Sequence, residues 1–233
     1  MNLNEFINEI KKLNISLNDK QLDQLNKYKE YLIEYNKHTN LTRIIDDNDI
    51  YLKHFYDSLT IVKYINLNNI NSLLDIGTGA GFPGMVLKIV FPNLNVTLLD
   101  SNNKKITFLK ELSNLLDINV ELINDRAENF IKNKREYYDI VVSRAVASLP
   151  ILLELSIPFV KKLGYFISMK GNALEELKIA SNTPEKLGAK LESINEFKLI
   201  KEDSSRTIII YKKIDNTNNK YPRLYDKIKK NPL

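Results

Sequence analysis

Four of the chain's seven glycines lie within eight positions, in the stretch LLDIGTGAGFPGMVLKIV at residues 73–90. Glycine costs backbone entropy wherever it lies, so such a cluster indicates an unusual backbone path or a ligand against the main chain. The run follows a predicted strand and opens a predicted helix, where bare N–H groups can bind a closely apposed ligand. We expect a ligand-binding loop that includes Gly77, Gly79 and Gly81. A tight strand-to-helix turn without a ligand is the simpler alternative.

Two cofactors fit this loop. Residues 79–84 match the pattern G-x-G-x-x-G, and Asp100 follows Gly79 by 21 positions at the end of the next predicted strand, as in dinucleotide-binding proteins. The alternating pattern from Asp75 through Gly81 is instead typical of enzymes that use S-adenosylmethionine. In a dinucleotide turn Asp75 would be buried without an evident partner, whereas the methionine moiety supplies an ammonium group. This favours S-adenosylmethionine, with an NAD-binding protein as the alternative.

The ends of the next two strands complete the expected cofactor site. Asp100 is placed to accept hydrogen bonds from both ribose hydroxyls. Ala127 and Glu128 follow the third predicted strand, where the adenine is expected. The same stretch also fits a short helix capped by Asp125, with Glu128 three positions later as a capping box. Both interpretations can hold together.

Length and composition limit the remaining classes. The 233 residues suit one α/β domain with an extension, and the formal net charge of +5 permits a nucleic-acid partner without requiring one. The absence of cysteine excludes disulfides, thiolate metal sites and cysteine nucleophiles, and it fits a reducing cytoplasm. We expect no metal site, no secretory signal and no transmembrane helix, since no run of eighteen apolar residues occurs.

The elements that must position these residues follow from hydrophobic periodicity. Residues 1–66 are predicted to form a helical extension with a second helix ending at Tyr64. The first helix carries one apolar stripe, formed by Leu22, Leu25, Tyr28, Leu32 and Tyr35. Residues 67–233 alternate short β-rich runs with amphipathic stretches, which indicates a doubly wound, mostly parallel seven-stranded sheet. The predicted strands are 72–77, 95–100, 119–125, 138–145, 164–170, 190–199 and 206–213, and the predicted helices are 82–91, 102–116, 127–134, 148–162 and 172–187.

The last two predicted strands are separated by only six residues. Such a connection forces a hairpin, so this edge of the sheet must be antiparallel. A doubly wound sheet that ends in an antiparallel hairpin differs from the usual dinucleotide fold. It therefore adds to the methyltransferase interpretation.

The residues after the fourth strand constrain the methylated atom. Residues 142–150 read VSRAVASLP and lack the Asn/Asp-Pro-Pro-aromatic tetrad of many enzymes that methylate exocyclic amines. Methylation of cytosine C5 usually requires a thiolate, which this chain lacks. A ring nitrogen with a lone pair, such as guanine N7, needs alignment and a compatible field and no general base. We expect Arg144, at the carboxyl end of the fourth strand, to orient the target.

Over nearly its whole length the chain resembles the bacterial 16S ribosomal RNA guanine-N7 methyltransferases, also called the glucose-inhibited division protein B family. The motifs that carry the resemblance are YNKHTNLTRI (35–44), HFYDSL (54–59), DIGTGAGFPG (75–84), VVSRAVASL (141–149), MKG (169–171) and KYPRLYDKIKKNPL (220–233). The resemblance implies a class I S-adenosylmethionine-dependent fold and a monomeric cytoplasmic enzyme. It implies methylation of one guanine in the 530 loop of the small-subunit RNA, free or within the 30S particle. Cofactor contacts carried over by motif are Gly77, Phe82, Ala127, Glu128 and Arg144.

Three further features have open interpretations. His54 is either a satisfied helix residue or a group that faces the cofactor behind its direct contacts. Lys170, at the end of the fifth strand, could meet a phosphate or be a solvated lysine. The tail from Lys220 is basic and carries tyrosines, so it is either a solvated end or an RNA-binding segment. Alternatives of other classes are a different RNA or small-molecule methyltransferase and an RNA-binding module without catalysis.

Overall fold

The computed structural model describes all 233 residues, which form two compact units. The first unit comprises residues 1–71 and 78–124, and the second comprises residues 72–77 and 125–233. The N-terminal helices and the glycine-rich loop from Thr78 onward thus belong to the first unit, whereas Gly77 belongs to the second. The division into residues 1–66 and 67–233 stays a prediction.

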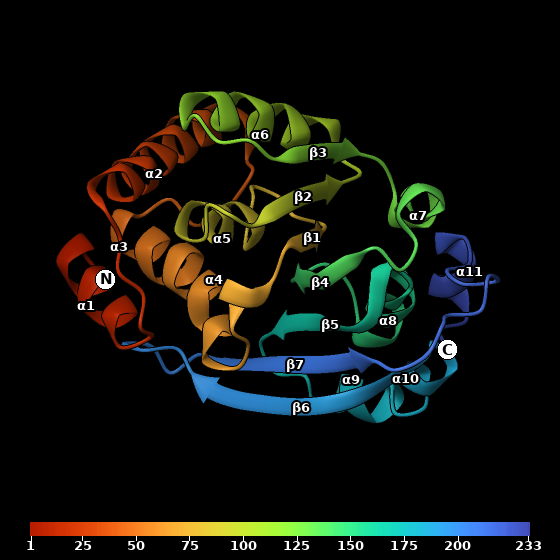
Figure 1. Ribbon diagram of the computed structural model, residues 1–233. Helices are drawn as coiled ribbons and strands as arrows, with labels where there is room; N and C mark the ends of the chain where they lie inside the picture. The colour runs from red at the N-terminus through yellow and green to blue at the C-terminus, as the bar shows by residue number, and fades with distance from the viewer. The chain divides into compact units, whose positions relative to one another are not determined.

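The first unit contains the parallel strand pair β2–β3 and all of the N-terminal helices (Figure 1). Its elements are α1 (Leu3–Lys11), α2 (Asp19–Thr39), α3 (Asp47–Asp49), η1 (Ile50–Tyr56), α4 (Asp57–Leu59), η2 (Thr60–Lys63), η3 (Leu67–Asn69), α5 (Gly84–Val90), β2 (Asn95–Asp100), α6 (Asn103–Leu115) and β3 (Glu121–Asn124).

The second unit holds five strands in the order β1-β4-β5-β7-β6. Its elements are β1 (Ser72–Ile76), α7 (Ala127–Lys134), β4 (Tyr138–Arg144), α8 (Leu149–Ser156), η4 (Ile157–Phe159), β5 (Val160–Lys170), α9 (Leu174–Ile179), α10 (Thr183–Lys186), β6 (Ala189–Lys198), β7 (Ser205–Lys213) and α11 (Tyr225–Lys230). β1, β4 and β5 pair in parallel, whereas β7 is antiparallel to both β5 and β6. The expected α/β class, with a mostly parallel seven-stranded sheet and an antiparallel hairpin at its end, is confirmed.

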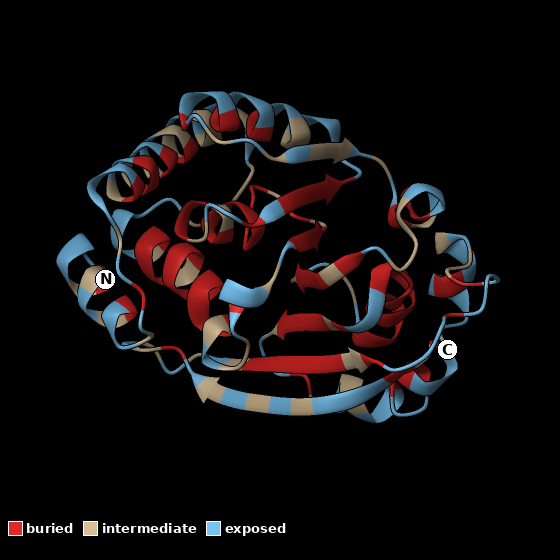
Figure 2. Cartoon of the chain, in the orientation of Figure 1, coloured by how far each residue is buried: buried red, intermediate tan, exposed pale blue.

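Burial along the strands follows their position in the sheet. Every residue of β1 is buried, as expected for a parallel strand covered on both faces. β7 lies between two strands and is mostly buried, while most of the edge strand β6 is exposed or half-buried (Figure 2). Lysines on β6 make this edge a poor template for pairing with another chain.

Local sequence signals explain the N-terminal helices. Asn2 and Asn18 cap α1 and α2, and each forms a capping box with the residue three positions later, Glu5 or Gln21. The centre of the predicted stripe on α2 is confirmed, since Leu25, Tyr28 and Leu32 are fully buried, whereas its ends, Leu22 and Tyr35, are half-buried. The second helix is also confirmed, but residues 47–63 mix α, π and 3-10 turns, with the π-helix η1 in the middle.

Two predicted helices differ from the structure. The helix predicted over residues 172–187 is divided into α9 (Leu174–Ile179) and α10 (Thr183–Lys186). The apolar pattern predicted a helix over residues 148–162, but α8 ends at Ser156 and β5 begins at Val160. Pairing with β4 explains the difference, because Val160 lies opposite Tyr138. The register then shifts through an irregularity, where Leu163 adopts a φ of +69°. A continuous apolar run does not separate a buried helix from a buried strand.

The C-terminal segment is tied to the second unit by an ion pair. Arg223 donates from Nε and Nη2 to the two carboxylate oxygens of Glu154, at 2.8 and 2.6 Å, and its backbone N–H donates to the same carboxylate. Glu154 is fully buried. The hydrogen bonds to Glu154 raise the pKa of Arg223 above its ordinary value. None of the helices in the structure combines the length and apolar character needed to cross a membrane.

Replacing Arg223 by alanine should destabilise the fold strongly. The substitution Arg223→Ala leaves the buried Glu154 carboxylate without its cation, which costs about 3–5 kcal/mol of unfolding free energy. Urea denaturation measures the loss. Lys230→Ala, an exposed cation seven positions later, is the control and should change the unfolding free energy by less than about 0.5 kcal/mol. If Arg223→Ala lowers the unfolding free energy no more than the control does, the stabilising role of the Arg223–Glu154 pair is contradicted.

Candidate active site

The glycine-rich loop in the first unit is fixed by backbone hydrogen bonds at its start. The N–H of Thr78 donates to the carbonyl of Leu99 in β2 at 3.1 Å, and the carbonyl of Thr78 accepts from Gly81 and Phe82 at 2.9 and 3.0 Å. Gly79 and Gly81 adopt φ values of +62° and +100°, which glycine reaches without strain. The unusual backbone path expected for the cluster is therefore present.

Asp100 joins this loop to the end of β2. Its Oδ2 accepts from the N–H of Gly79 at 3.0 Å and its Oδ1 from the N–H of Asn102 at 2.9 Å. The Lys105 ammonium lies 3.5 Å from Oδ2. An ionised carboxylate has about four acceptor positions, so two amide bonds leave capacity for further donors such as ribose hydroxyls. Asp100 is 6% exposed, which makes each such hydrogen bond stronger than in water.

Aromatic rings of the N-terminal helices cover Phe82. The ring of Tyr28 stacks on it with centroids 5.3 Å apart, and the ring of His54 does so at 4.2 Å. The Tyr28 hydroxyl donates to the carbonyl of Ala80. The side chain of Phe82 is thus part of the first unit's core. The cofactor contact expected at Phe82 stays a prediction.

His54 has a defined partner inside the first unit. Its Nε2 lies 3.1 Å from the hydroxyl of Thr42, and the residue is buried. Asn36 in turn holds Thr42, because its side-chain amide bonds both the N–H and the carbonyl of Thr42 at 2.9 Å. His54 therefore packs on Phe82 and is oriented through Thr42. A direct role toward the cofactor or the target stays a prediction.

In the second unit, Asp75 and Gly77 lie at the carboxyl end of β1. Asp75 is fully buried, opposite Val142 of β4. Gly77 has a φ of +69°, and a Cβ there would lie 2.4 Å from a methyl group of Val146. Gly77 must therefore be glycine because of the segment that follows β4. Ser143 also ties these strands, since its hydroxyl donates to the carbonyl of Ile76 at 2.8 Å.

The segment after Arg144 is held by Lys170. Arg144 is the last residue of β4, and Ala145 adopts a φ of +56°. Lys170 donates to the carbonyl of Ala147 at 2.7 Å and pairs with Glu176 at 2.8 Å. The Glu176 carboxylate also accepts from the N–H of Leu149. The interpretation of Lys170 as a solvated lysine is wrong, because its side chain is only 9% exposed, and a phosphate contact stays a prediction.

Ala127 and Glu128 begin α7. Ala127 is buried, and the Glu128 side chain is 6% exposed with the Arg126 guanidinium 3.4 Å away. The expected capping box is wrong, because Arg126 is the cap residue and no side chain caps the helix. Asp125 instead accepts from the N–H of Arg126 at 2.7 Å and from the Asn129 amide at 3.1 Å.

Residues 21–207 match the family described as rRNA small subunit methyltransferase G. A protein of that name from Bacillus subtilis is 46% identical over 100% of this chain and 99% of its own length. Another from Acetivibrio thermocellus is 49% identical over 94% and 91%. This chain belongs to the rRNA small subunit methyltransferase G family. The resemblance noted from its motifs is thereby confirmed.

Solved structures place the fold of this family member among methyltransferases. A SAM-dependent methyltransferase from Aquifex aeolicus has a TM-score of 0.57 at 19% identity, covering 76% of this chain and 98% of its own. TYW2 of M. jannaschii, solved with AdoMet, has a TM-score of 0.54 at 17% identity, covering 74% and 80%. At these identities the likeness shows the fold alone.

Sequence reasoning missed several residues that shape the site of this family member. Periodicity assigns Tyr28 only to an apolar stripe. Asn36 and Thr42 lie within the motif at residues 35–44, and the sequence indicates no role for either. No sequence pattern indicated a role for Glu176, which pairs with Lys170. Each acts through a partner far along the chain; Tyr28 and Ala80, for example, are 52 positions apart. Local periodicity cannot reveal such contacts.

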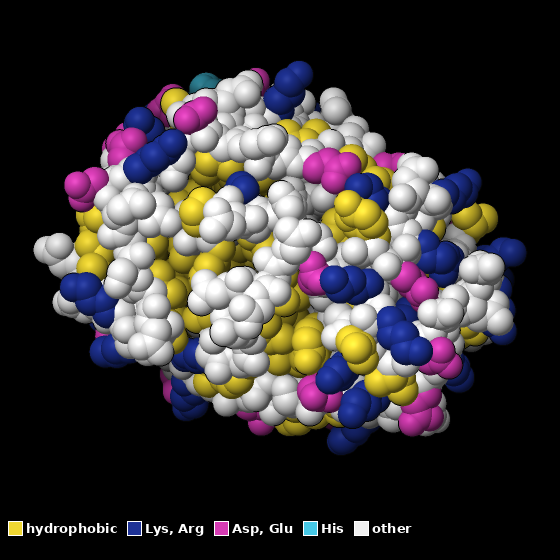
Figure 3. Space-filling view, in the orientation of Figure 1, with side chains coloured by type: hydrophobic (Ala, Val, Ile, Leu, Met, Phe, Trp, Pro, Cys, Tyr) yellow, Lys and Arg dark blue, Asp and Glu magenta, His cyan; other side chains and the backbone are white.

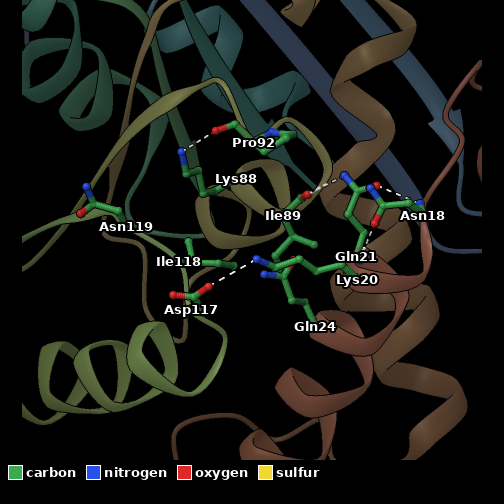
Figure 4. Close-up of a pocket in the computed structure, with 10 residues that line it drawn as sticks. All are labelled: Asn18, Lys20, Gln21, Gln24, Lys88, Ile89, Pro92, Asp117, Ile118 and Asn119. Atoms are coloured by element: carbon green, nitrogen blue, oxygen red, sulfur yellow. Dashed lines mark hydrogen bonds and ion pairs between the residues drawn. The ribbon is translucent and has the colours of Figure 1, made fainter.

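A pocket in the first unit contains none of the expected site residues (Figure 4). Its polar groups bind one another. Lys20 pairs with Asp117 at 3.3 Å, and Lys88 donates to the carbonyls of Pro92 and Leu94. Gln21 donates to the carbonyl of Ile89 at 2.8 Å. Burial lowers the pKa of Lys88. These bonds join α2 to the segments around α5 and α6, so we assign the pocket a structural role.

Gly81→Ala should destabilise the protein even without any ligand. A Cβ there would lie 2.6 Å from the Tyr28 hydroxyl and 2.9 Å from a methyl of Leu109, at a positive φ. Strain and overpacking together should cost at least about 2 kcal/mol of unfolding free energy in urea denaturation. The matched control is Gly171→Ala, where the nearest atom is 3.9 Å away.

A double-mutant cycle identifies the origin of this cost. In a Tyr28→Phe background the hydroxyl that meets the new methyl group is gone, so Gly81→Ala should cost measurably less than in the original protein. An equal cost in both backgrounds would show that Tyr28 is not the reason for glycine at position 81.

Proposed function

We propose that this family member transfers a methyl group from S-adenosylmethionine to N7 of one guanine in the 530 loop of 16S ribosomal RNA. The observation that carries the proposal is membership of the rRNA small subunit methyltransferase G family along the whole chain. The arrangement of Asp100 and the glycine-rich loop supports it. We further propose that the protein acts as a monomer in the cytoplasm, on free rRNA or on the 30S particle.

S-adenosylmethionine fits the donor set of the chain. Its sulfonium supplies an electrophilic methyl group. We assign the ribose hydroxyls to the Asp100 carboxylate and the methionine ammonium to Asp75. We assign the close contact between the cofactor and the main chain to the backbone of Gly77, Gly79, Gly81 and Phe82. Ala127 and Glu128 are assigned to the adenine, and Arg144 to the cofactor and target together. The dinucleotide alternative would place a pyrophosphate at the glycine-rich loop, but methyl transfer by this family requires no pyrophosphate.

Arg144 is proposed to orient the guanine without moving a proton. The N7 lone pair is already nucleophilic, and its alkylation moves positive charge onto the purine. A guanidinium aimed at N7 would oppose that charge, whereas donors on O6 or a flanking phosphate would favour binding. Support comes from the segment after Arg144, which Lys170 and the Val146–Gly77 contact hold in one shape. Lys170 thus acts as a positioning residue, and His54 acts behind Phe82.

Cofactor binding should depend on Asp100. Asp100→Asn keeps the size of the side chain but removes the charge and one acceptor oxygen, so affinity for S-adenosylhomocysteine should fall about tenfold or more. Gly79→Val, which puts a β-branched residue at a φ of +62°, should abolish binding. Calorimetric titration measures both, with circular dichroism to verify folding and NAD as the comparison ligand. Preferential binding of NAD would contradict the cofactor assignment.

The reaction itself tests the proposed target. Incubation with methyl-labelled cofactor and 16S rRNA or 30S subunits from unmodified cells should yield N7-methylguanosine in the 530 loop, located by mass spectrometry of nuclease fragments. Label on another base, or in a small molecule only, would contradict the proposal.

Arg144 variants test the orienting role in the same assay. At saturating cofactor, Arg144→Ala should lower turnover by orders of magnitude, with a smaller loss of cofactor affinity. Arg144→Lys should restore little, because the planar fork is lost. If the lysine variant kept most of the turnover, a simple nearby positive charge would be enough and the bidentate role would be wrong.

A further inference from the structure

Helix α7 is joined at both ends to the segment that leads into α11. At its start, the Arg126 guanidinium lies 5.2 Å from the centre of the Tyr225 ring. Beyond its end, Arg135 Nη2 donates to the carbonyl of Tyr221 at 2.5 Å. α7 and residues 221–225 therefore lie side by side within the second unit, as Figure 1 also shows.

The segment around α11 is anchored as a fixed surface. Arg223 binds the buried Glu154, and Thr183 donates to the carbonyl of the last residue, Leu233, at 2.7 Å. Ile228 of α11 is fully buried, while Lys227, Lys229 and Lys230 are exposed. Because both sides of the helix are tied down, these lysines project from a defined place. The backbone of the tail is thus fixed, and its exposed lysines stay open to both interpretations, solvation and RNA binding.

Exposed cations outnumber exposed acids on these two neighbouring segments. We call their exposed cations the basic α7–α11 surface; they are Arg126, Lys132, Lys227, Lys229 and Lys230. The acids nearby are Asp226, which is exposed, Asp125, whose carboxylate accepts from the N–H of Arg126 and from the Asn129 amide, and Glu128, whose carboxylate lies beside the Arg126 guanidinium. None of the four lysines forms an ion pair with a carboxylate. Figure 3 shows Lys and Arg side chains gathered at the right-hand edge, where Figure 1 places α7 and α11.

We infer that the basic α7–α11 surface binds backbone phosphates of the RNA substrate; this inference rests on the proposed function. Like charges three positions apart on a helix, such as Lys227 and Lys230, repel each other, and bound phosphates relieve that repulsion. Each lysine that neutralises a phosphate also releases counterions. The surface begins beside Ala127 and Glu128, which we assign to the cofactor. RNA held here would therefore lie beside the proposed adenine end of the cofactor.

The test replaces the four lysines and compares an equal change of charge elsewhere. The surface variant carries Lys132→Gln, Lys227→Gln, Lys229→Gln and Lys230→Gln. The control carries Lys178→Gln, Lys186→Gln, Lys190→Gln and Lys198→Gln, all exposed residues of the same unit. Binding of an RNA fragment that contains the 530 loop is measured from low to high KCl, together with binding of S-adenosylhomocysteine.

The surface variant should bind RNA at least about tenfold more weakly at low salt, and the slope of log affinity against log salt should flatten by roughly 3. Cofactor affinity should stay within about twofold of the original. In the methylation assay KM for RNA should rise, with turnover at saturating RNA largely kept. The control should keep most of the original slope.

Three results would overturn the inference. The first is an unchanged slope in the surface variant. The second is an equal change in the control, which would assign the effect to net charge. The third is loss of binding to anionic phosphatidylglycerol vesicles with RNA binding intact, which would assign the surface to lipid headgroups. If the original protein methylates 16S rRNA while the surface variant behaves like it, only this inference fails. If the original methylates no RNA but the slope still flattens, the proposed function fails and the RNA-binding surface stands.

Discussion

The hydrogen bond between the Asp100 carboxylate and the N–H of Gly79 is the constraint on which the rest of the first unit's site depends. Asp100 is nearly buried, so its charge must be met by donors, and the loop amide supplies one at 3.0 Å. That bond, with the one from Thr78 to Leu99, fixes where the loop turns. The positions of Ala80 and Phe82 follow, and these are the groups on which the N-terminal helices pack.

The N-terminal helices therefore do more than extend the fold. Tyr28 bonds the carbonyl of Ala80 and stacks on Phe82, so a residue of α2 fixes the loop from outside. His54 stacks on the same ring from within a π-helix, a geometry often found at functional sites. The glycine at position 81 makes room for the Tyr28 hydroxyl. Glycine is thus required in this cluster partly by the packing of these helices and partly by the path of the main chain.

Much of this could be predicted from the sequence, because the signals were local. The alternation of strands and helices, the hairpin forced by a short connection, and Asp100 at a strand end all follow from periodicity and spacing. The start of β5 could not be predicted, since Val160 pairs with Tyr138 at a sequence distance that no local pattern records. The same holds for Lys170, whose partner Ala147 is 23 positions away. A charged residue at a strand end can bind a ligand or hold a loop, and its residue type does not distinguish the two.

In the second unit the backbone after Arg144 adopts an unfavourable conformation, which neighbouring residues stabilise. Ala145 has a positive φ, which costs a non-glycine residue free energy unless the surroundings impose it. Lys170 and Glu176 hold the segment through Ala147 and Leu149, and the missing Cβ of Gly77 leaves space for Val146. A rigid backbone segment beside Arg144 favours its proposed role in orienting the target, because folding has already ordered the segment and binding need not do so. The same contacts explain why Gly77 serves the structure whether or not a ligand is bound. Glycine there allows the ends of β1 and β4 to approach each other.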